Sequence, residues 1–199
     1  MSKIRLGVII LAAGQSKRMG EENKLTKTFR GAPLIGHVAR TVSNLEAADI
    51  VAVLGHDAEK VAHVLADSPS VRAVYNSDYG SGMASSLKVA VSTLSGEIDA
   101  FLVCLGDMPL ISKETIQQLL DAIEPGGSSI VVPTFGGRRG NPVLWSNGYR
   151  CHFSELNDDI GAKPLLKKFE GHVIEVEVSD EGVIRDFDDP ASFASDKTS

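Results

Sequence analysis

The chain has 199 residues, of which 43% are hydrophobic and 23% charged, and its formal net charge at pH 7 is −6. This length suffices for one domain with a sizeable core, and the composition is that of an ordinary soluble protein. The negative charge argues against a nucleic-acid backbone as the main partner, because such a partner requires a basic surface, but it permits local binding of one small anion.

The cysteines and the apolar runs indicate the compartment. Cys104 lies in the hydrophobic run FLVCL and Cys151 lies far from it in the sequence, which favours a reducing compartment over a disulfide framework or a zinc site. The apolar run near the N-terminus is too short for a signal peptide, and no run approaches the length of a membrane span. We therefore expect a cytoplasmic protein without a membrane partner.

Strand and helix patterns alternate over the first two thirds of the chain. The run RLGVIILA is continuously apolar, which is typical of a strand buried on both faces. Asp57 and Ser112 stand where helix caps are expected. Strands are predicted at residues 5–12, 49–55, 71–76, 98–109 and 128–135, and helices at 33–45, 57–66, 82–94 and 113–123. This alternation predicts an α/β fold in three layers, with helices on both faces of a mainly parallel sheet.

The pattern loosens from about residue 136 onward. Residues 136–145 predict a loop and a short strand, and residues 161–169 a short helix. Two late strands are expected at residues 172–178 and 182–188. We expect them to complete the same sheet, or a small subsheet at its edge, and to form no independent domain.

The loop that follows the first strand, AAGQSKRMG, combines glycines with positive charge. In parallel α/β sheets, ligands bind beyond the carboxyl ends of the strands. Flexible backbone amides together with Lys17, Arg18 and Lys24 suit a ligand with several negative charges, such as a triphosphate. The spacing fits neither a Walker loop, because five residues separate Gly14 from Gly20, nor a dinucleotide fingerprint. The alternative is a solvated loop with ordinary surface charges.

Acidic residues follow the strongest later strand and recur near the C-terminus. Asp107, in LGDMP, ends a hydrophobic strand and is interpreted as a ligand of Mg²⁺ or, alternatively, as a loop or capping aspartate. In RDFDDP, alternation along a strand would place Asp186 and Asp188 on one face, where they could converge on a metal. The alternative there is a solvated acidic strand end.

The stretch GSGMASSL precedes a predicted helix. Its small residues and hydroxyls, next to free amides at a helix N-terminus, suit contact with a ribose and a base. A glycine turn with a serine cap is the alternative.

Six motifs in order resemble one family. LAAGQSKRMG, followed by NKL and GAPLIGHV, is succeeded by YGSGMASSLKVAV, LGDMPLI, GRRGNPVLW, DDIGAKPLL and VIRDFDDPASF. This series resembles the nucleotidyltransferases that act on molybdenum cofactor, within a superfamily of glycosyltransferase-A-like fold. The resemblance implies a single domain over residues 1–199, with a nucleotide-binding part at about 1–110 and an acceptor-binding part at about 111–190. It implies catalytic roles for Arg18, Lys24 and Asp107, Mg²⁺ on Asp107 and Asp188, and nucleotide contacts from Leu11, Ala12, Ala13, Gly14, Gln15, Ser16, Arg18, Lys24, Gly82, Ser85 and Ser86.

The choice of nucleotide rests on two motifs. Relatives that transfer guanylate resemble LAGG in the first loop and GPL in the later one, whereas relatives that transfer cytidylate resemble AAG and GM-SS. Ala13 before Gly14 follows the second pattern, and its methyl group narrows the space near the base, which favours CTP.

The resemblance implies that the acceptor is bound by Gly140, Asn141, Pro142 and Asp159. The family often carries histidine where Asn141 stands, and the GDxGAR pattern is replaced by DDIGAK, with Lys163 where arginine is usual. A lysine does not reproduce the bidentate fork of arginine, so these departures concern the identity of the acceptor. Arg138 and Arg139 either meet the acceptor phosphate or are solvated loop charges.

The expected reaction is transfer of a cytidylyl group from CTP to the phosphate of molybdopterin, with release of pyrophosphate. The attacking phosphate oxygen is already ionised, so no general base is required, and positioning with charge neutralisation suffices. The alternatives are guanylyl transfer from GTP, transfer to another small phosphate such as a sugar or alditol phosphate, and a non-catalytic nucleotide sensor. The resemblance also raises a transient handover of the product to a molybdoenzyme or its chaperone.

Overall fold

The hydrophobic run at the N-terminus forms β1 (Leu6–Ala12), a strand in the middle of the sheet. This computed structural model describes residues 4–16, 23–124, 126–157, 160–188 and 192–193. β1 pairs in parallel with β4 (Ala47–Leu54) on one side and with β6 (Ala100–Leu105) on the other. Because both edges of β1 are paired and both its faces covered, its apolar residues are buried, except for the partly buried Leu11 near its carboxyl end.

Eight strands of the described chain form the main sheet, in the order β10–β7–β9–β6–β1–β4–β5, with β8 paired to β7. β9 runs antiparallel to β6 and β7, and β8 antiparallel to β7, while all other neighbours are parallel. The remaining strands are β5 (Arg72–Tyr75), β7 (Ile130–Phe135), β8 (Arg138–Arg139), β9 (Val143–Ser146) and β10 (Val173–Glu177). The predicted mainly parallel sheet is thereby confirmed.

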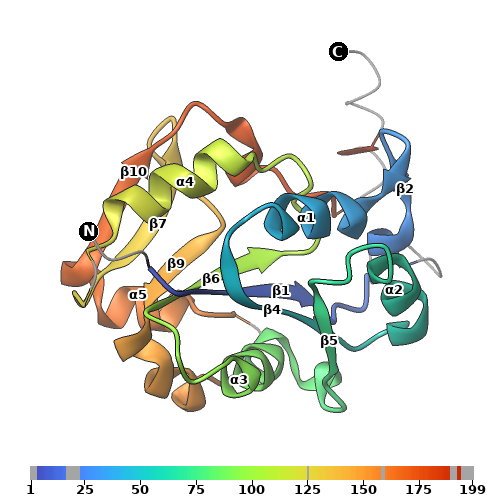
Figure 1. Cartoon of the computed structure of the whole chain (residues 1–199), viewed down its shortest axis with the longest axis horizontal. Helices are drawn as coiled ribbons and strands as arrows, with labels where there is room; N and C mark the ends of the chain where they lie inside the picture. Colours follow the sequence, from blue (N-terminus) through green and yellow to red (C-terminus); the bar gives the residue numbers. More distant parts are fainter. Residues whose placement is uncertain (1–3, 17–22, 125, 158–159, 189–191, 194–199) are drawn as a thin grey trace.

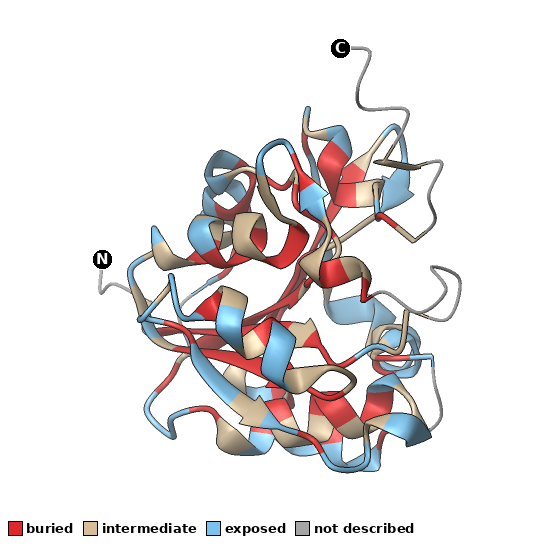
Figure 2. Cartoon of the chain, turned by 90° about the vertical axis from the view of Figure 1, so that its right-hand side faces the viewer, coloured by how far each residue is buried: buried red, intermediate tan, exposed pale blue. Residues whose placement is uncertain are grey.

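Helices cover both faces of this sheet (Figure 1). One face carries α1 (Leu34–Ser43), α2 (Ala58–Leu65) and α4 (Lys113–Ala122), and the other carries α3 (Met83–Thr93), α5 (Lys163–Lys168) and the 3₁₀ segment η4 (Asn147–Glu155). Alternate residues of β1 point to opposite faces, so Val8 and Ile10 pack with the first group while Ile9 packs with the second. Figure 2 shows the buried strands between the two helical layers. The three-layer prediction is confirmed.

Several shorter elements join these layers. They are η2 (Lys24–Thr26), the hairpin β2 (Thr28–Phe29) and β3 (Ala32–Pro33), η3 (Tyr79–Ser81), η5 (Glu170–His172) and η6 (Glu181–Ile184). The hairpin and η4 were not predicted, because neither has a periodic apolar pattern long enough to mark it.

The predicted strand at residues 182–188 is wrong. The segment begins as η6 and continues without regular structure. Its backbone forms hydrogen bonds that do not belong to a β-sheet. The N–H of Asn141 donates to the carbonyl oxygen of Val183 (2.8 Å), and the N–H of Phe187 donates to the carbonyl oxygen of Asp107 (3.1 Å). Only the first of the two late strands, β10, joins the sheet, at its edge beside β7.

The two predicted helix caps have different outcomes. Ser112 accepts the N–H of Thr115 and caps α4, as expected. Asp57 occupies the cap position of α2 but makes no capping hydrogen bond, because its φ of +53° is in the left-handed region and its carboxylate instead contacts Lys60 at 3.1 Å.

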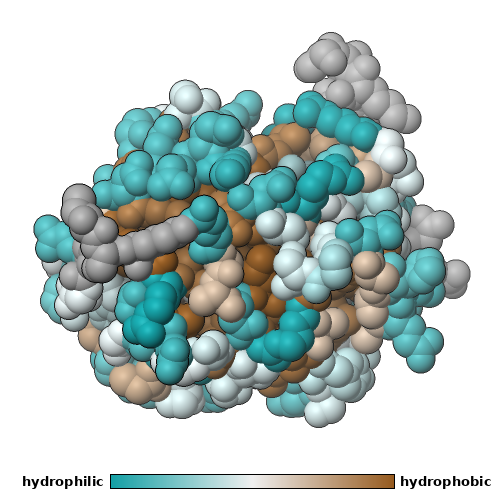
Figure 3. Space-filling model, in the orientation of Figure 1, coloured by the Kyte–Doolittle hydropathy of each residue, from teal (hydrophilic) through white to brown (hydrophobic). Residues whose placement is uncertain are grey.

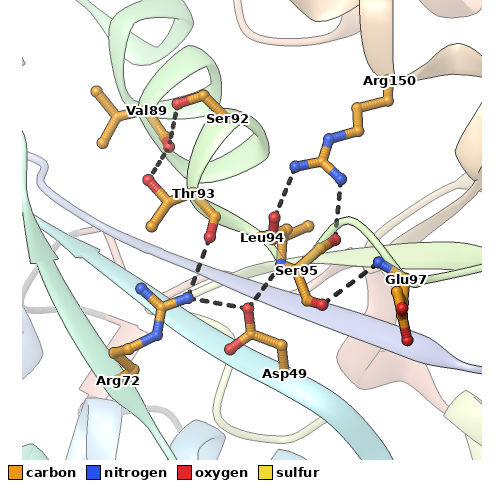
Figure 4. A network of polar contacts seen from close by, with 9 residues as sticks. All are labelled: Asp49, Arg72, Val89, Ser92, Thr93, Leu94, Ser95, Glu97 and Arg150. Atoms are coloured by element: carbon orange, nitrogen blue, oxygen red, sulfur yellow. Dashed lines mark hydrogen bonds and ion pairs between the residues drawn. The ribbon is translucent and has the colours of Figure 1, made fainter.

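A polar network fixes the C-terminal end of α3 (Figure 4). Arg150, from η4, donates to the carbonyl oxygens of Leu94 (2.7 Å) and Ser95 (2.9 Å), which lie where the helix has ended. Asp49 accepts from Arg72 and from the N–H of Ser95, both at 2.9 Å. A cation at the C-terminal end of a helix is favourable, and the contacts join α3 to β4, β5 and η4.

Neither cysteine of the chain is in a disulfide: Cys104 is buried in β6 and Cys151 is exposed. Burial raises the pKa of the Cys104 thiol to about 12. In the part of the chain that the structure describes, no helix has the length and apolarity to cross a membrane. Hydrophilic residues cover most of the face shown in Figure 3, and hydrophobic side chains are visible mainly in its middle, over the sheet.

Candidate active site

A cavity of about 410 Å³ lies at the carboxyl ends of β1 and β6, beside the start of α3. This is the end to which β1 and β6 run in Figure 1, and Figure 2 views the molecule from that side. The described residues that line the cavity are Leu11, Ala13, Gly14, Gln15, Ser16, Lys24, Leu25, Tyr79, Gly80, Gly82, Met83, Ser86, Leu105, Asp107, Asp186 and Asp188. The cavity therefore lies at the carboxyl ends of the strands, where the sequence predicts ligand binding.

Two glycines allow neighbouring loops to approach the end of β1. The N–H of Gly106 donates to the carbonyl oxygen of Leu11 (3.0 Å), and a Cβ at residue 106 would lie 2.9 Å from that same oxygen. A Cβ at Gly55 would lie 2.5 Å from the Cβ of Tyr79. The turn that carries Asp107 and the loop that carries Tyr79 thus reach the cavity only because these positions lack a side chain.

Lys24 is held at the cavity by its own neighbours. Asn23, almost fully buried, caps η2 by accepting the N–H of Leu25 (3.0 Å) and donates to the carbonyl oxygen of His56 (3.2 Å). The N–H of Lys24 donates to Ser16 Oγ (3.2 Å). The first loop and η2 are therefore tied together at the position where Lys24 leaves the backbone.

The ammonium of Lys24 bridges two carboxylates from distant parts of the chain. Its Nζ lies 2.5 Å from Asp107 Oδ2 and also donates to Asp188 Oδ1. Burial lowers the pKa of Lys24, but attraction and hydrogen bonding from Asp107 and then Asp188 outweigh it, so the net pKa is raised. Lys24 is therefore a cation throughout the neutral range.

Asp186 adds a third carboxylate to the cavity wall. Burial raises its pKa, and the negative charges of Asp188 and Asp107 raise it further. Alternation along a strand was expected to bring Asp186 and Asp188 to one face. Both do line the cavity, but the irregular backbone after η6 brings them there and not strand alternation.

Asp107 and Asp188 are suited to hold a divalent metal ion. The Lys24 ammonium stands between their oxygens as a cation would, and carboxylate oxygens are the ligands that Mg²⁺ and Mn²⁺ prefer. Among the described residues, no group of three or more histidine, cysteine, aspartate or glutamate side chains is gathered for a metal. Two carboxylates completed by substrate phosphates are the usual arrangement for Mg²⁺, and the donor set fits it.

The start of α3 forms the opposite wall. Gly82 precedes the helix with φ +109°, a value that side-chain-bearing residues rarely adopt. Ser86, nearly fully buried, faces the cavity from the first turn of α3. Asn76, also nearly fully buried, donates to Ser85 Oγ (2.9 Å) and to Ser86 Oγ (3.0 Å).

Some predicted site residues are not at the cavity. The Ala12 side chain is buried in the core on the side of α1, and Ser85 Oγ is bonded to Asp78 and Gly82. Arg139 is not among the residues that line the cavity and pairs with Glu170 and Glu175, both at 2.6 Å. Arg18 and Asp159 lie outside the described residues.

Gly140, Asn141 and Pro142, three of the predicted acceptor residues, are not among those that line the cavity. The N–H of Gly140 donates to the carbonyl oxygen of Pro133 (2.8 Å), and a Cβ there would clash with the carbonyl oxygen of Val183. Asn141 and Pro142 are joined by a cis peptide bond. These residues, none of which lines the cavity, hold the segment that leads to Asp186 and Asp188.

Sequence reasoning did not name Leu25, Tyr79, Gly80 or Leu105 as site residues and used Met83 only within the GM-SS pattern, yet all five complete the wall. Tyr79, Gly80 and Met83 lie in the stretch NSDYGSGMASS, which its position after a predicted strand marks as a candidate ligand loop. The apolar Leu25 and Leu105 carry no such signal, since each resembles an ordinary core residue.

A family model for the MobA-like NTP transferase domain matches residues 8–173. The chain is 33% identical over 172 residues to the bifunctional protein GlmU of Leifsonia xyli, covering 83% of this chain, but it spans only about a third (35%) of GlmU's length. It is 32% identical over 186 residues to nicotine blue oxidoreductase of Paenarthrobacter nicotinovorans, covering 90% of each chain.

Solved structures share the fold. A nucleotidyl transferase from Methanothermobacter thermautotroptrophicus superposes with a TM-score of 0.84 at 22% identity, covering 96% of this chain and 95% of that one. Rv0371C of Mycobacterium tuberculosis, solved in complex with manganese, gives a TM-score of 0.78 at 22% identity, covering 96% and 97%. The match of the family model over residues 8–173 and the relative at 32% identity show that the chain belongs to the family of MobA-like NTP transferase domains.

Proposed function

We propose that this nucleotidyltransferase transfers a cytidylyl group from CTP to the phosphate of molybdopterin and releases pyrophosphate, with Mg²⁺ as its metal ion. The observation that carries the proposal is the contact of Lys24 with both Asp107 and Asp188 beside the loop that follows β1. At that place the cation can bind the phosphates of a nucleoside triphosphate, and the two carboxylates can bind its metal ion. The proposal extends to a cytoplasmic location and to handover of the product to a molybdoenzyme or its chaperone.

The chain's own groups divide the work of the reaction. Lys24 would turn from the carboxylates to the phosphates and neutralise the charge that develops on the departing pyrophosphate, with Arg18 in the same role. Asp107 and Asp188 would hold Mg²⁺, which supplies charge neutralisation and alignment of the phosphates when it is bound. An acceptor phosphate is ionised at neutral pH, so the attacking oxygen needs no general base, and holding it in line with the scissile bond is sufficient.

The preference for CTP rests on the wall formed by the first loop. Ala13 lines the cavity and its methyl group takes up space that a glycine would leave open. A smaller pyrimidine base is favoured in the narrower space. GTP is the alternative nucleotide, and direct competition between the two distinguishes them.

The acceptor rests on the family pattern after β7. In this chain Asn141 and Lys163 stand where histidine and arginine are common in the family. Another small phosphate, such as a sugar or alditol phosphate, is therefore the alternative acceptor. Gly161, in the DDIGAK stretch, lies close to Met83 on the cavity wall, since a Cβ at residue 161 would be 2.7 Å from the Met83 sulfur. This contact favours an acceptor site that adjoins α3.

Release of pyrophosphate tests the proposal. The purified chain is incubated with Mg²⁺ and CTP, GTP, ATP or UTP, with molybdopterin, a sugar phosphate or no acceptor. Pyrophosphate release that requires both CTP and molybdopterin is the expected result. Release with GTP instead of CTP, or with a different acceptor, would replace those parts of the proposal. Binding of nucleotide without release under any condition would favour the nucleotide sensor.

A further inference from the structure

The orientation of the Asn76 side chain is fixed by a backbone donor. Asn76 follows β5, is 2% exposed, and its Oδ1 accepts the backbone N–H of Asp78 at 3.0 Å. A backbone N–H is only a donor, so it must face the amide oxygen and not the amide nitrogen. The NH₂ group of Asn76 therefore points to the other side, toward α3.

That NH₂ group determines the roles of two serine hydroxyls. It donates to Ser85 Oγ (2.9 Å) and to Ser86 Oγ (3.0 Å), so both oxygens are acceptors. The hydroxyl hydrogen of Ser85 is used locally, on the carbonyl oxygens of Asp78 (2.9 Å) and Gly82 (2.8 Å). The hydroxyl hydrogen of Ser86 is given to no acceptor within the described residues, although this residue is 4% exposed and lines the cavity.

We propose that Asn76 is a positioning residue for nucleotide selection: it occupies the acceptor side of Ser86 Oγ, so that the Ser86 hydroxyl donates into the cavity to a carbonyl oxygen of the nucleobase. A serine hydroxyl has one hydrogen to donate and two lone pairs that accept. The NH₂ group of Asn76 takes one of these lone pairs and no described residue takes the hydrogen, so the Ser86 hydroxyl is set to donate into the cavity. The site thus recognises a base with a carbonyl oxygen on the edge it presents, such as O2 of a pyrimidine. Adenine has no exocyclic oxygen and would have to accept this hydrogen bond through a ring nitrogen, so we expect it to bind less tightly.

This inference rests on the proposed function, because it concerns the nucleotide of that same cavity. It accounts for selection by a group other than Ala13. Ala13 acts by limiting space, whereas Ser86 acts through the polarity of one hydrogen bond. The two effects are therefore separable by substitution.

Substitution of Asn76 by aspartate tests the polarity directly. Asn76→Asp keeps the acceptor for the Asp78 N–H but replaces the NH₂ group by an acceptor, so the Ser86 hydroxyl must turn toward residue 76. The dissociation constants of CTP, ATP and ribose 5-triphosphate, which has no base, are measured with Mg²⁺ at pH 8, well above the ordinary pKa of aspartate. Ser86→Ala, the double variant and Ser92→Ala, which removes an exposed hydroxyl from the same helix, complete the set. Thermal unfolding of each variant reports on its fold.

The expected result is a loss of CTP affinity of about 3- to 10-fold for Ser86→Ala, the effect of one neutral hydrogen bond, and at least as much for Asn76→Asp. Ribose 5-triphosphate should bind all variants equally, and Ser92→Ala should bind CTP as the wild type does. The double variant should match Ser86→Ala, because Asn76 acts through Ser86 and the two effects are not additive.

Three outcomes would overturn the inference. The first is unchanged CTP affinity in folded Asn76→Asp or Ser86→Ala. The second is an equal loss for CTP and ribose 5-triphosphate, which would reveal a general distortion of α3. The third is additive losses in the double variant. A wild-type chain that binds none of the triphosphates would instead overturn the proposed function, and the inference with it.

Discussion

The backbone N–H of Phe187 donates to the carbonyl oxygen of Asp107 at 3.1 Å, and this bond joins the C-terminal segment to the turn that follows β6. The next side chain, Asp188, meets Asp107 across the ammonium of Lys24. Three groups from the beginning, middle and end of the chain are thereby held at one point of the cavity. Each of them can be removed separately, so their contributions to metal binding and turnover are measurable one by one.

Substitution of Asp107 by asparagine should abolish most of the turnover and leave the fold intact. The new amide would keep the shape of the side chain but not its charge, so a metal ion and Lys24 would both lose a partner. We expect pyrophosphate release to fall by at least about 100-fold, the scale seen when one preorganised electrostatic contact is removed. Asp121→Asn, at an exposed aspartate on α4 bonded to Gln117, is the matched control. Near-normal turnover in folded Asp107→Asn would reject the metal role of this carboxylate.

Lys24→Met should strengthen binding of Mn²⁺ in the absence of nucleotide and weaken binding of the triphosphate. In the wild type, the ammonium neutralises Asp107 and Asp188, so a free cation must displace it. Without the ammonium, the two carboxylates lose the cation that they share, and we expect the affinity for Mn²⁺ to rise by on the order of tenfold, or about 1.4 kcal/mol. Titration of free Mn²⁺ by electron paramagnetic resonance measures this change.

The control for Lys24 is Lys167→Met, which removes the same charge from an exposed position on α5. It should leave both affinities close to those of the wild type. Weaker or unchanged Mn²⁺ binding in Lys24→Met would show that the two carboxylates are not the cation site.

The sequence predicts the three layers and the end of the sheet that carries the cavity, because both depend on patterns within short stretches of the chain. Val8, Ile9 and Ile10 form a continuous apolar run because helices cover both faces of β1. Such a run can be recognised in the amino-acid sequence alone. The loops that follow β1 and β6 were identified by composition, and they do border the cavity.

Other features depend on contacts between distant residues and leave no local pattern. The alternation of RDFDD resembles a strand, yet Val183 is bonded to Asn141 and Phe187 to Asp107, and these contacts replace the ladder. Asn76 resembles an ordinary turn residue in the sequence, and its role depends on two serines of the next helix. The predicted acceptor residue Asn141 is bonded to the same segment, and none of residues 140–142 lines the cavity.

Asp180 should contribute both to stability and to the position of Asp188. Its carboxylate accepts from the N–H of Ser112 (2.9 Å), the hydroxyl of Thr115 (2.7 Å) and the N–H of Gly182 (2.9 Å), and so joins η6 to the start of α4. Asp180→Ala removes all three bonds, and we expect the free energy of unfolding in urea to fall by about 2–4 kcal/mol. The Kd for Mn²⁺ should also rise in the folded variant, because the segment that carries Asp188 loses its anchor.

The contribution of Asp180 to the free energy of unfolding should decrease as the pH falls. Burial raises its pKa, but hydrogen bonds from Ser112, Thr115 and Gly182 outweigh burial, and the net pKa is lowered. The unfolded chain therefore binds this proton more tightly than the folded chain. The stabilisation is complete above the unfolded value of about 3.9 and is lost as the pH falls through the folded pKa. The difference in unfolding free energy between wild type and Asp180→Ala should shrink between about pH 5 and about pH 2, and a constant difference would contradict this account.

Arg150→Ala should lower the stability of the protein without changing nucleotide binding at the N-terminal end of α3. Arg150 binds the carbonyl oxygens of Leu94 and Ser95, just beyond the C-terminal end of the helix, whereas Ser86 and Met83 line the cavity from the first turn. Loss of these two contacts should lower the free energy of unfolding by about 1–2 kcal/mol. The KM for the nucleotide should stay near that of the wild type, because β4 and β5 still hold α3 through Asp49 and Arg72. A raised KM with unchanged stability would mean that the far end of α3 controls the cavity directly, and that the helix does not behave as a rigid wall.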